Sequence, residues 1–399
     1  MQIKDKKILV LSKIYNEEDV EIEELKELIL TAEGNFCSFI NQINDEINTA
    51  TYFGKGKLEF IKNVASELGV ECVQIAEDIT PVQLSNLIDY LEVPVMDRTM
   101  LILEIFNMRA TTHIAKLQVE LAEKSYMYPR LKSLRDNYDR EGGSGKTRGK
   151  GEQKLELDRR NYRDKVNELK RNLKELKKKE ELKSKKRIAS SIPLVAMIGY
   201  SNVGKSTILN KLIEHSNGDE KLKVYADDKL FATLEPSSRL IKLSTGKSFI
   251  LSDTVGLISN LPHGLVEAFS STLQVVKDAD LILEIRDISN ENLYRETETT
   301  NMVLDELKVI DNKRIIFYNK KDLIENNSSV FAISALNDDD IKKLISIIEE
   351  RLFGKLIKVT KKFVYEETKE MFNYANDLID SKIIYEDDFI LVEGFVYEK

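Results

Sequence analysis

Residues 199–207 form a glycine-rich segment with the spacing of a phosphate-binding loop. Gly199 and Gly204 bracket it, and Lys205 and Ser206 complete the pattern G-x-x-x-x-G-K-[ST]. Glycines at this spacing let the backbone curl so that successive N–H groups point toward a polyphosphate. Lys205 is then expected to reach its β- and γ-phosphates, and the Ser206 hydroxyl to bind Mg²⁺. The alternative is a loop that only turns the chain. The residues expected to contact phosphate are Gly199, Tyr200, Ser201, Asn202, Val203, Gly204, Lys205, Ser206 and Thr207.

A second motif, D-x-x-G, lies at Asp253-Thr254-Val255-Gly256. Asp253 is expected to serve as the carboxylate that lies just outside the direct ligands of magnesium in P-loop nucleotide hydrolases, and the Gly256 N–H to bind the γ-phosphate. The motif is common by chance. Its position after a predicted strand, further along the chain than the glycine-rich loop, makes it informative.

A third motif, N-K-x-D, comprises Asn319, Lys320, Lys321 and Asp322. A carboxylate at Asp322 would accept hydrogen bonds from N1–H and the 2-amino group of guanine. Adenine offers neither donor, so such a site can discriminate by roughly 10⁴. The alternative is a turn or helix cap. The loop that follows the next predicted strand is expected to contact the base, and it contains Ser334, Ala335 and Leu336.

The segment between Ser206 and Asp253 corresponds to the first switch of a nucleotide hydrolase. Thr233 is the only threonine between Ile208 and Ser244, and it is the candidate for a second hydroxyl ligand of Mg²⁺. The alternative is that Thr233 is an ordinary surface threonine. The predicted nucleotide site also includes the residues next to Thr233, namely Phe231, Ala232 and Leu234. Lys205, Thr233 and Gly256 are the residues expected to act in catalysis.

These motifs all follow predicted strands. Apolar runs predict strands at 194–198, 248–252, 281–286, 314–318 and 330–333. In an open parallel α/β sheet, ligands bind outside the carboxyl ends of the strands. Residues 191–353 are therefore predicted to form a P-loop domain, with a parallel sheet and flanking helices.

Residues 1–95 predict a smaller α/β domain with a largely parallel sheet. Strands are expected at 8–11, 36–43 and 71–75, and helices at 20–30 and 57–68. The stretch Gly54-Lys55-Gly56-Lys57 precedes the second helix. It is interpreted as an anion-binding helix N-terminus or as a plain turn with solvated lysines.

Residues 96–190 predict an antiparallel helical hairpin. Apolar spacing indicates one long helix from Met96 to Tyr128, which ends or kinks at Pro129. A basic, glycine-rich loop follows at 137–151, and then a second helix. Its seam is expected to consist of Leu155, Tyr162, Val166, Leu169, Leu173 and Leu176. Residues 144–187 contain 18 Lys or Arg against 8 Asp or Glu. This excess indicates either nucleic-acid binding or a solvated face.

The composition of the chain also indicates the cellular compartment in which the protein is expected. The 399 residues carry a net charge of -8, and residues 354–399 predict a small α/β appendage. Cys37 and Cys72 are far apart in the sequence, which is typical of buried thiols in a reducing compartment. The first apolar run is too short for a signal peptide, and none reaches membrane-spanning length. A cytoplasmic protein is therefore expected.

Several segments together resemble the HflX family of ribosome-associated GTPases. The resemblance covers residues 1–353 and rests on 54–57, 95–98, 149–160, 230–236, 253–257 and 261–269. It implies an N-terminal α/β domain, a helical hairpin, a GTPase domain and association with the large ribosomal subunit and its rRNA. Ribosome rescue, splitting and biogenesis are all roles of such proteins, and the sequence does not choose among them.

One residue departs from the family pattern. Leu257 follows the D-T-V-G motif, where the family often has an aromatic residue and Ras-like GTPases have a water-orienting glutamine. We therefore expect a monomeric, magnesium-dependent GTPase that binds GTP and GDP, hydrolyses GTP slowly alone, and does not bind DNA. The competing hypothesis is a ribosome- or RNA-binding regulator whose output is nucleotide-dependent occupancy. A second nucleotide in the N-terminal domain is a third possibility.

Overall fold

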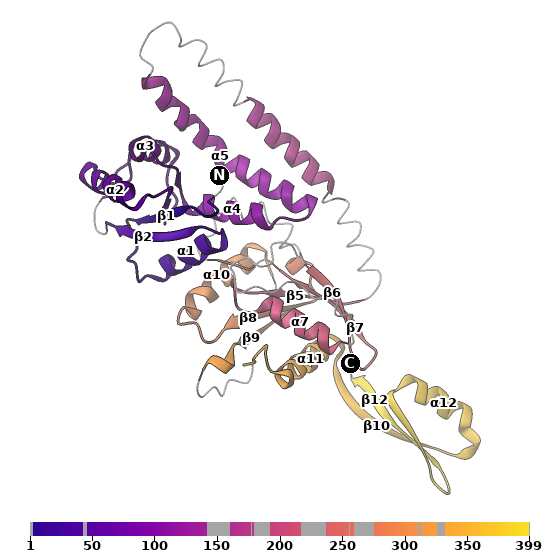
Figure 1. The fold of residues 1–399 in the computed structure, drawn as a ribbon. Coiled ribbons are helices and arrows are strands. Elements are labelled where there is room, and N and C mark those ends of the chain that lie inside the picture. Colours follow the sequence, from indigo (N-terminus) through magenta and orange to yellow (C-terminus); the bar gives the residue numbers. More distant parts are fainter. Residues whose placement is uncertain are drawn as a thin grey trace. The chain divides into compact units, whose positions relative to one another are not determined.

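The computed structural model describes residues 3–42, 46–141, 160–176, 178, 192–216, 237–254, 256–258, 275–309, 313–324 and 332–398. The chain divides into two compact units (Figure 1). The first comprises residues 1–185, 227–235 and 255–273, and the second comprises 186–226, 236–254 and 274–399. The division into four domains predicted from the sequence is finer than this one.

The first unit contains a four-stranded parallel sheet of order β2-β1-β3-β4. Its strands are β1 (Lys7–Ser12), β2 (Asn35–Asn41), β3 (Cys72–Ile75) and β4 (Val95–Met96). The connecting helices are α1 (Val20–Thr31), α2 (Lys55–Leu68) and α3 (Pro81–Leu91). Apolar residues of the strands pack with those of α2 and α3 into one core. The predicted parallel α/β fold is confirmed, although α3 and β4 were not anticipated.

The single long helix expected from Met96 is wrong, because the chain forms two helices. They are α4 (Arg98–Arg109) and α5 (His113–Glu141). Ala110 has extended backbone angles, and the Thr112 hydroxyl accepts the Ala115 N–H at 3.2 Å. A threonine that caps a new helix in this way competes with continuation of the preceding one.

Of the two alternatives predicted at Pro129, the helix end is wrong, because α5 continues to Glu141. Pro129 has no N–H and costs helical stability at this position. The residues around it are held by tertiary bonds. The Tyr126 hydroxyl donates to Asp97 at 2.7 Å, and Arg130 donates to the same carboxylate at 2.9 Å. Asp97 is fully buried at the start of α4. These contacts outweigh the local preference of proline.

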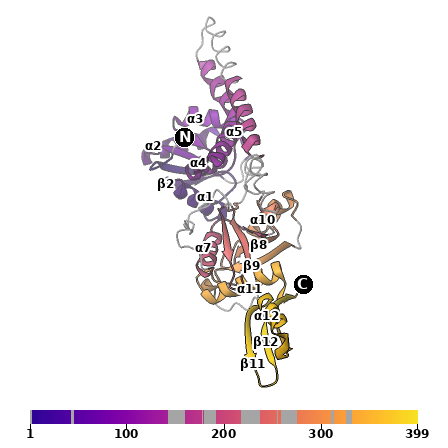
Figure 2. The same ribbon diagram turned by 90° about the vertical axis from the view of Figure 1, so that its right-hand side faces the viewer.

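Residues 160–176 form the second helix of the hairpin and lie beside α5 (Figure 2). Leu117 of α5 packs against Leu169 and Leu173, and Lys124 lies over the Tyr162 ring. Later residues of α5 therefore meet earlier residues of the partner helix, as an antiparallel pair requires. The basic tip, with Lys146, Arg148 and Lys150, lies outside the described residues, as does Leu155 of the predicted seam.

The second unit contains a five-stranded sheet of order β6-β7-β5-β8-β9. Its strands are β5 (Leu194–Ile198), β6 (Ser237–Lys242), β7 (Ser248–Asp253), β8 (Leu281–Asp287) and β9 (Arg314–Asn319). All pairings are parallel except β6 with β7. The helices are α7 (Lys205–His215), α10 (Leu293–Glu306) and α11 (Asp338–Phe353). The predicted P-loop fold is confirmed, with the unanticipated β6 as an antiparallel edge strand.

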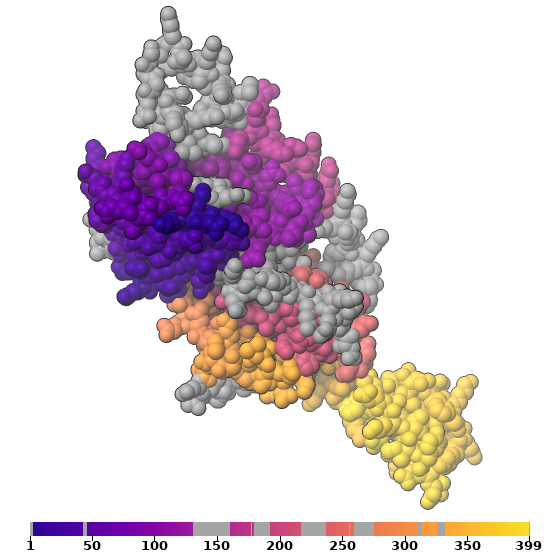
Figure 3. All heavy atoms as spheres, in the orientation of Figure 1, coloured from indigo at the N-terminus to yellow at the C-terminus, as the bar shows by residue number. Residues whose placement is uncertain are grey.

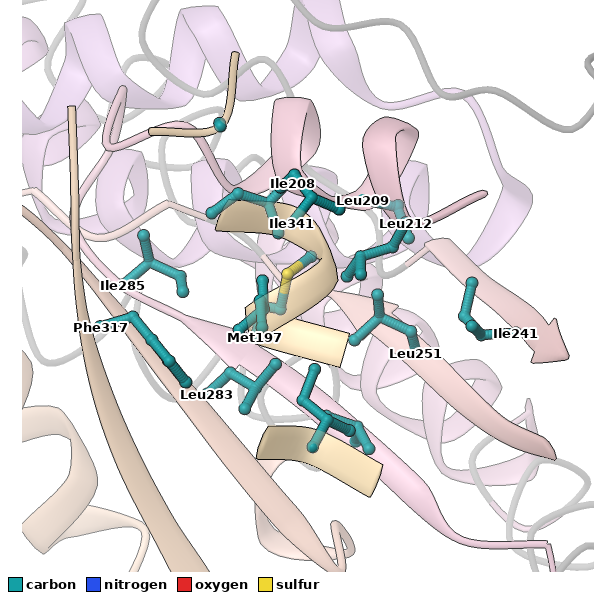
Figure 4. Packing of buried hydrophobic residues seen from close by; sticks show 14 of the residues in the cluster. Met197, Ile208, Leu209, Leu212, Ile241, Leu251, Leu283, Ile285, Phe317 and Ile341 are labelled. Atoms are coloured by element: carbon teal, nitrogen blue, oxygen red, sulfur yellow. The ribbon is translucent and has the colours of Figure 1, made fainter. Parts of the chain in front are cut away.

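Helices α7 and α11 pack on the same face of this sheet (Figure 4). Met197, Leu251 and Leu283 from three neighbouring strands lie beneath Leu209 of α7 and Ile341 of α11, and all five are fully buried. Burying one such side chain contributes about 1.5–3 kcal/mol. The core fixes where α7 and α11 begin, and therefore where their first turns meet the carboxyl edge of the sheet.

The last part of the second unit is a three-stranded antiparallel sheet of order β10-β12-β11, covered by one helix (yellow in Figure 3). Its elements are β10 (Lys355–Phe363), α12 (Thr368–Asp377), β11 (Ile379–Tyr385) and β12 (Ile390–Glu398). The Tyr397 hydroxyl donates to Thr245 at 2.8 Å in the β6–β7 turn and also bonds to Glu349 of α11. These bonds anchor β12 to the P-loop domain.

Among the described residues, every helix is too short or too polar to cross a membrane.

Candidate nucleotide-binding site

The glycine-rich loop connects β5 to α7 at the centre of the carboxyl edge of the sheet. Gly204 adopts φ 93°, and a Cβ there would lie 2.4 Å from Nδ2 of Asn319. A Cβ at Gly199 would lie 2.2 Å from the backbone oxygen of Ile285. Both positions therefore require glycine for close approach of the loop to β8 and β9. The first turn of α7 follows directly and presents its N–H groups at this edge.

Lys205 is the first residue of α7, and its side chain is buried. The ammonium donates to the carbonyls of Gly199 at 3.0 Å and Tyr200 at 2.6 Å, so it lies across the mouth of its own loop. Burial lowers the pKa of Lys205 to about 8, while the nearby carboxylates of Asp253 and Glu296 partly oppose this shift. Phosphate oxygens at this position would offer a negatively charged partner in place of neutral carbonyls.

Ser206 and Asp253 bring a hydroxyl and a carboxylate together beside the loop. The Ser206 Oγ donates to Oδ2 of Asp253 at 2.7 Å, and Asp253 is fully buried at the end of β7. The next residue, Thr254, donates to the Met197 carbonyl at 2.6 Å and fixes the end of β7 against β5. Mg²⁺ prefers oxygen ligands of this kind and usually takes its remaining ligands from phosphate and water. The residues present therefore fit a magnesium site.

The N-K-x-D segment follows β9 and is bonded to both neighbouring loops. Asn319 donates from Nδ2 to the Val203 carbonyl at 2.8 Å and accepts the Ala335 N–H on Oδ1 at 2.9 Å. Lys320 pairs with Asp287 at the end of β8, with 2.7 Å between Nζ and Oδ2. The structure thus joins the predicted phosphate loop, N-K-x-D loop and Ser334 loop through one asparagine side chain.

Asp322 lies in a short 3₁₀ turn, Lys321–Leu323, and its side chain is exposed. A pocket opens between this turn and the loop before α11. Its lining residues are Lys321, Asp322, Ile324, Ser334, Leu336 and Asn337. The pocket therefore contains the predicted guanine-reading carboxylate and two of the three residues predicted for the second base loop.

Some predicted site residues lie outside the described residues, namely Phe231, Ala232, Thr233, Leu234 and Val255. Gly256 and Leu257 are described and buried, and Leu257 is 3% exposed. A buried leucine has no group that can hydrogen-bond to water.

Two acidic residues in this region were not predicted. Asp287 ends β8 at the same edge as Asp253 and could have been found from that shared position. Asp340 is one of three consecutive aspartates at the start of α11, and it is the buried one. Composition alone does not separate it from its two neighbours, because only the register of the helix decides which of them faces inward.

A phosphate loop, a D-x-x-G motif and an N-K-x-D segment at one edge of this sheet define the class of P-loop GTPases. Family comparisons agree along the chain. Residues 19–107 match the "GTP-binding GTPase N-terminal" family, residues 109–187 the "GTP-binding GTPase Middle Region", and residues 194–320 the "50S ribosome-binding GTPase" family.

Curated relatives match most of the chain. It is similar to GTPase HflX of Caldanaerobacter subterraneus subsp. tengcongensis, with 41% identity over 96% of this chain and 88% of the relative. GTPase HflX of Escherichia coli K12 is 33% identical over 90% and 86%. The crystal structure of SsGBP with GDP is 24% identical over 86% of this chain and 99% of that chain, with a TM-score of 0.49. The chain belongs to the HflX family of GTPases, and its activity is GTP hydrolysis.

Proposed function

We propose that GTP binds with its triphosphate in the 199–207 loop and its guanine at Asp322, and that the protein acts on the large ribosomal subunit in the cytoplasm. The nucleotide assignment rests on the hydrogen bonds that the side chain of Asn319 makes to two loops. This side chain bonds to the phosphate loop on one side and to the loop of Ala335 on the other. One side chain therefore bridges the loop proposed for the phosphates and a loop of the proposed base pocket.

The residues of the loop supply most of the binding groups. N–H groups of the loop and of the first turn of α7 face the phosphates, and the Lys205 ammonium exchanges loop carbonyls for phosphate oxygens. Ser206, Asp253 and Thr233 are the residues that would hold Mg²⁺. A bound Mg²⁺ neutralises charge on the β- and γ-phosphates. Gly256 donates its N–H to the γ-phosphate.

Leu257 sets the rate expected of the free protein. GTP hydrolysis needs a group that orients the attacking water, and glutamine supplies it in Ras-like enzymes. Leu257 is buried and apolar, so it cannot do so. We therefore assign the missing group to a partner that binds the GTP form. The name of the family matched by residues 194–320 supports the large ribosomal subunit as that partner.

The hairpin supports the same partner. Its tip and second helix carry the excess of Lys and Arg residues between 144 and 187. A polyanion such as rRNA attracts this charge, and each neutralised phosphate releases counterions. DNA offers similar phosphates, but the family match favours rRNA.

Two measurements on the full chain test the proposal. Co-sedimentation with purified large subunits is expected to require a GTP analogue and to be lost with GDP. Single-turnover hydrolysis is expected to be slow alone and at least about tenfold faster with subunits. Intrinsic turnover above about 1 s⁻¹ without further stimulation would contradict a partner-completed site. GTP-dependent binding without stimulation would favour the alternative function, in which occupancy of the ribosome is the output.

The hairpin is tested through its salt dependence. Changing Lys146, Arg148 and Lys150 together to Ala is expected to flatten the log–log slope of affinity against salt by about two to three. GTP affinity is expected to stay unchanged. An unchanged slope and subunit affinity would move the binding surface away from the tip.

A further inference from the structure

Asp340 occupies an unusual position for a carboxylate in the first turn of a surface helix. Its side chain is buried, with the residue 4% exposed, and Asn337 caps the same turn by accepting the N–H groups of Asp339 and Asp340. The neighbouring Asp338 and Asp339 are exposed and pair with surface groups. Burial of a charged group is costly unless it is fully paired, so the partners of Asp340 are informative.

Those partners belong to the two loops that line the base pocket. Oδ2 of Asp340 accepts the backbone N–H of Ser334 at 2.9 Å. Oδ1 pairs with the Lys321 ammonium at 2.5 Å. Ser334 and Lys321 both line the pocket that contains Asp322, whereas Asp340 lies behind them and does not line it. One carboxylate therefore bonds to both walls of the pocket from outside.

The two walls are also joined directly. The Lys321 N–H donates to the Ile333 carbonyl at 3.2 Å, and the Ala335 N–H to Asn319 at 2.9 Å. These bonds hold the first residues of each loop, where the chain leaves the sheet. Asp340 is bonded instead through the side chain of Lys321 and the backbone of Ser334, next to Asp322 and Leu336.

We infer that Asp340 is a positioning residue for guanine recognition, which holds the Lys321–Asp322 turn and the Ser334–Leu336 loop at the separation that a purine ring requires. The inference rests on the proposed assignment of guanine to Asp322. The residue acts through Lys321 and Ser334 and does not touch the base. Preorganised loops bind without first being ordered, so loss of the carboxylate weakens binding of the base.

The test uses Asp340→Asn, which removes the charge that pairs with Lys321 but keeps an acceptor for Ser334. Lys321→Met breaks the same pair from its more exposed end and leaves the buried turn of α11 intact. Asp339→Asn is the matched control, because it makes the same chemical change one residue away, where the side chain is exposed and pairs with Lys342. Thermal melting confirms that each variant is folded before binding is measured.

Dissociation constants are measured for GDP and for IDP, whose base lacks the 2-amino group. The expected result is GDP binding about tenfold weaker in both Asp340→Asn and Lys321→Met, as for a lost bond to a charged group. IDP binding is expected to weaken less, so that the ratio of the two constants narrows. A purely structural role would lower the melting temperature and leave this ratio unchanged.

The inference is overturned if GDP affinity and the GDP-to-IDP ratio in both variants stay within about twofold of the Asp339→Asn control. Asp322→Asn, measured alongside, separates this outcome from a failure of the site assignment. If Asp322→Asn weakens GDP binding and the Asp340 and Lys321 variants do not, the positioning role alone is wrong. If Asp322→Asn also has no effect, the guanine site itself is wrongly assigned and the inference falls with it.

Discussion

Ser206 donates a hydrogen bond of 2.7 Å to Asp253, although the two residues lie on different elements, α7 and β7. The bond connects the phosphate loop to the segment that follows β7. It also places a hydroxyl and a carboxylate side by side, as a hard oxygen-binding metal requires. Each residue belongs to a sequence motif that follows a strand, and the sheet brings them together because β5 and β7 are neighbours.

Ser206→Ala is expected to remove the magnesium-dependent part of nucleotide affinity. The ratio of the GDP affinity in Mg²⁺ to the GDP affinity in EDTA should fall about tenfold or more, because one metal ligand is lost. Titration of a fluorescent GDP analogue in both conditions measures this effect. Ser238→Ala is the control, since it removes a hydroxyl that donates to Ser252 within the sheet. An effect of equal size in EDTA would remove Ser206 from the metal site.

Thr233→Ala separates the two nucleotide states. A switch threonine binds Mg²⁺ only while the γ-phosphate is present, so GTP-analogue affinity should fall and GDP affinity should stay unchanged. Isothermal titration with both nucleotides measures the difference. Equal losses for the two nucleotides would mean that Thr233 is not the switch residue.

Asp322→Asn is expected to weaken GTP binding strongly, because the acceptor for N1–H and the 2-amino group is lost. Xanthine nucleotide should gain affinity, since its base presents an oxygen that an amide can bond to. Asp305→Asn, on the exposed surface of α10, is the matched control. GTP affinity within about threefold of the wild type, below roughly 0.7 kcal/mol, would contradict the assignment.

We predict that nucleotide affinity depends on pH through the ammonium group of Lys205. Burial lowers its pKa to about 8 in the free protein, and bound phosphate favours the protonated form. Binding therefore takes up a proton above that pKa, and affinity is expected to be constant below about pH 8 and to fall as the pH rises further. GDP titrations from about pH 7 to about pH 9 test this, with Lys205→Met as the variant whose profile should be flat.

The same pKa makes a prediction about the free protein. The folded-state pKa lies below the ordinary value of 10.5, so the unfolded state binds more protons between the two values. The contribution of Lys205 to stability should therefore rise with pH through that window. Comparison of wild type with Lys205→Met by urea unfolding isolates it. A contribution that falls over the same range would contradict the burial of the ammonium.

Arg130→Met is expected to destabilise the first unit by about 3–5 kcal/mol, because it leaves the buried Asp97 carboxylate without its cation. Urea unfolding, with hydrogen exchange of α3 and α5 to identify the unit, measures the change. Lys165→Met is the control, since it breaks an exposed pair with Glu168 that is worth about 1 kcal/mol at most. Similar losses in both variants would mean that the buried pair carries little stability.

The strands and loops of the site were predictable because local signals agree there. The apolar runs before Gly199, Asp253 and Asn319 each form a strand of the sheet, and the polar motif begins at the carboxyl end. Parallel pairing then brings the motifs together without further information. The relative positions of these motifs follow from the strand order, which also brings Gly204 close to Asn319.

Other features depend on contacts that the local sequence does not contain. Pro129 indicates a helix end, whereas the bonds of Tyr126 and Arg130 to Asp97 support the continuation of α5. The choice of Asp340 over Asp338 and Asp339 depends in the same way on the register of α11 against the sheet. Both cases involve partners distant in the sequence.

The strand order of the β10-β12-β11 sheet has a consequence for association between molecules of this protein. β12 is the central strand, and β10 and β11 each pair with it and not with one another. One edge of β10 therefore pairs with no other strand among the described residues. Unpaired strand edges promote aggregation, and lysines along an edge oppose it. β10 carries four, at Lys355, Lys358, Lys361 and Lys362. These charges oppose pairing of β10 with a strand of a second molecule.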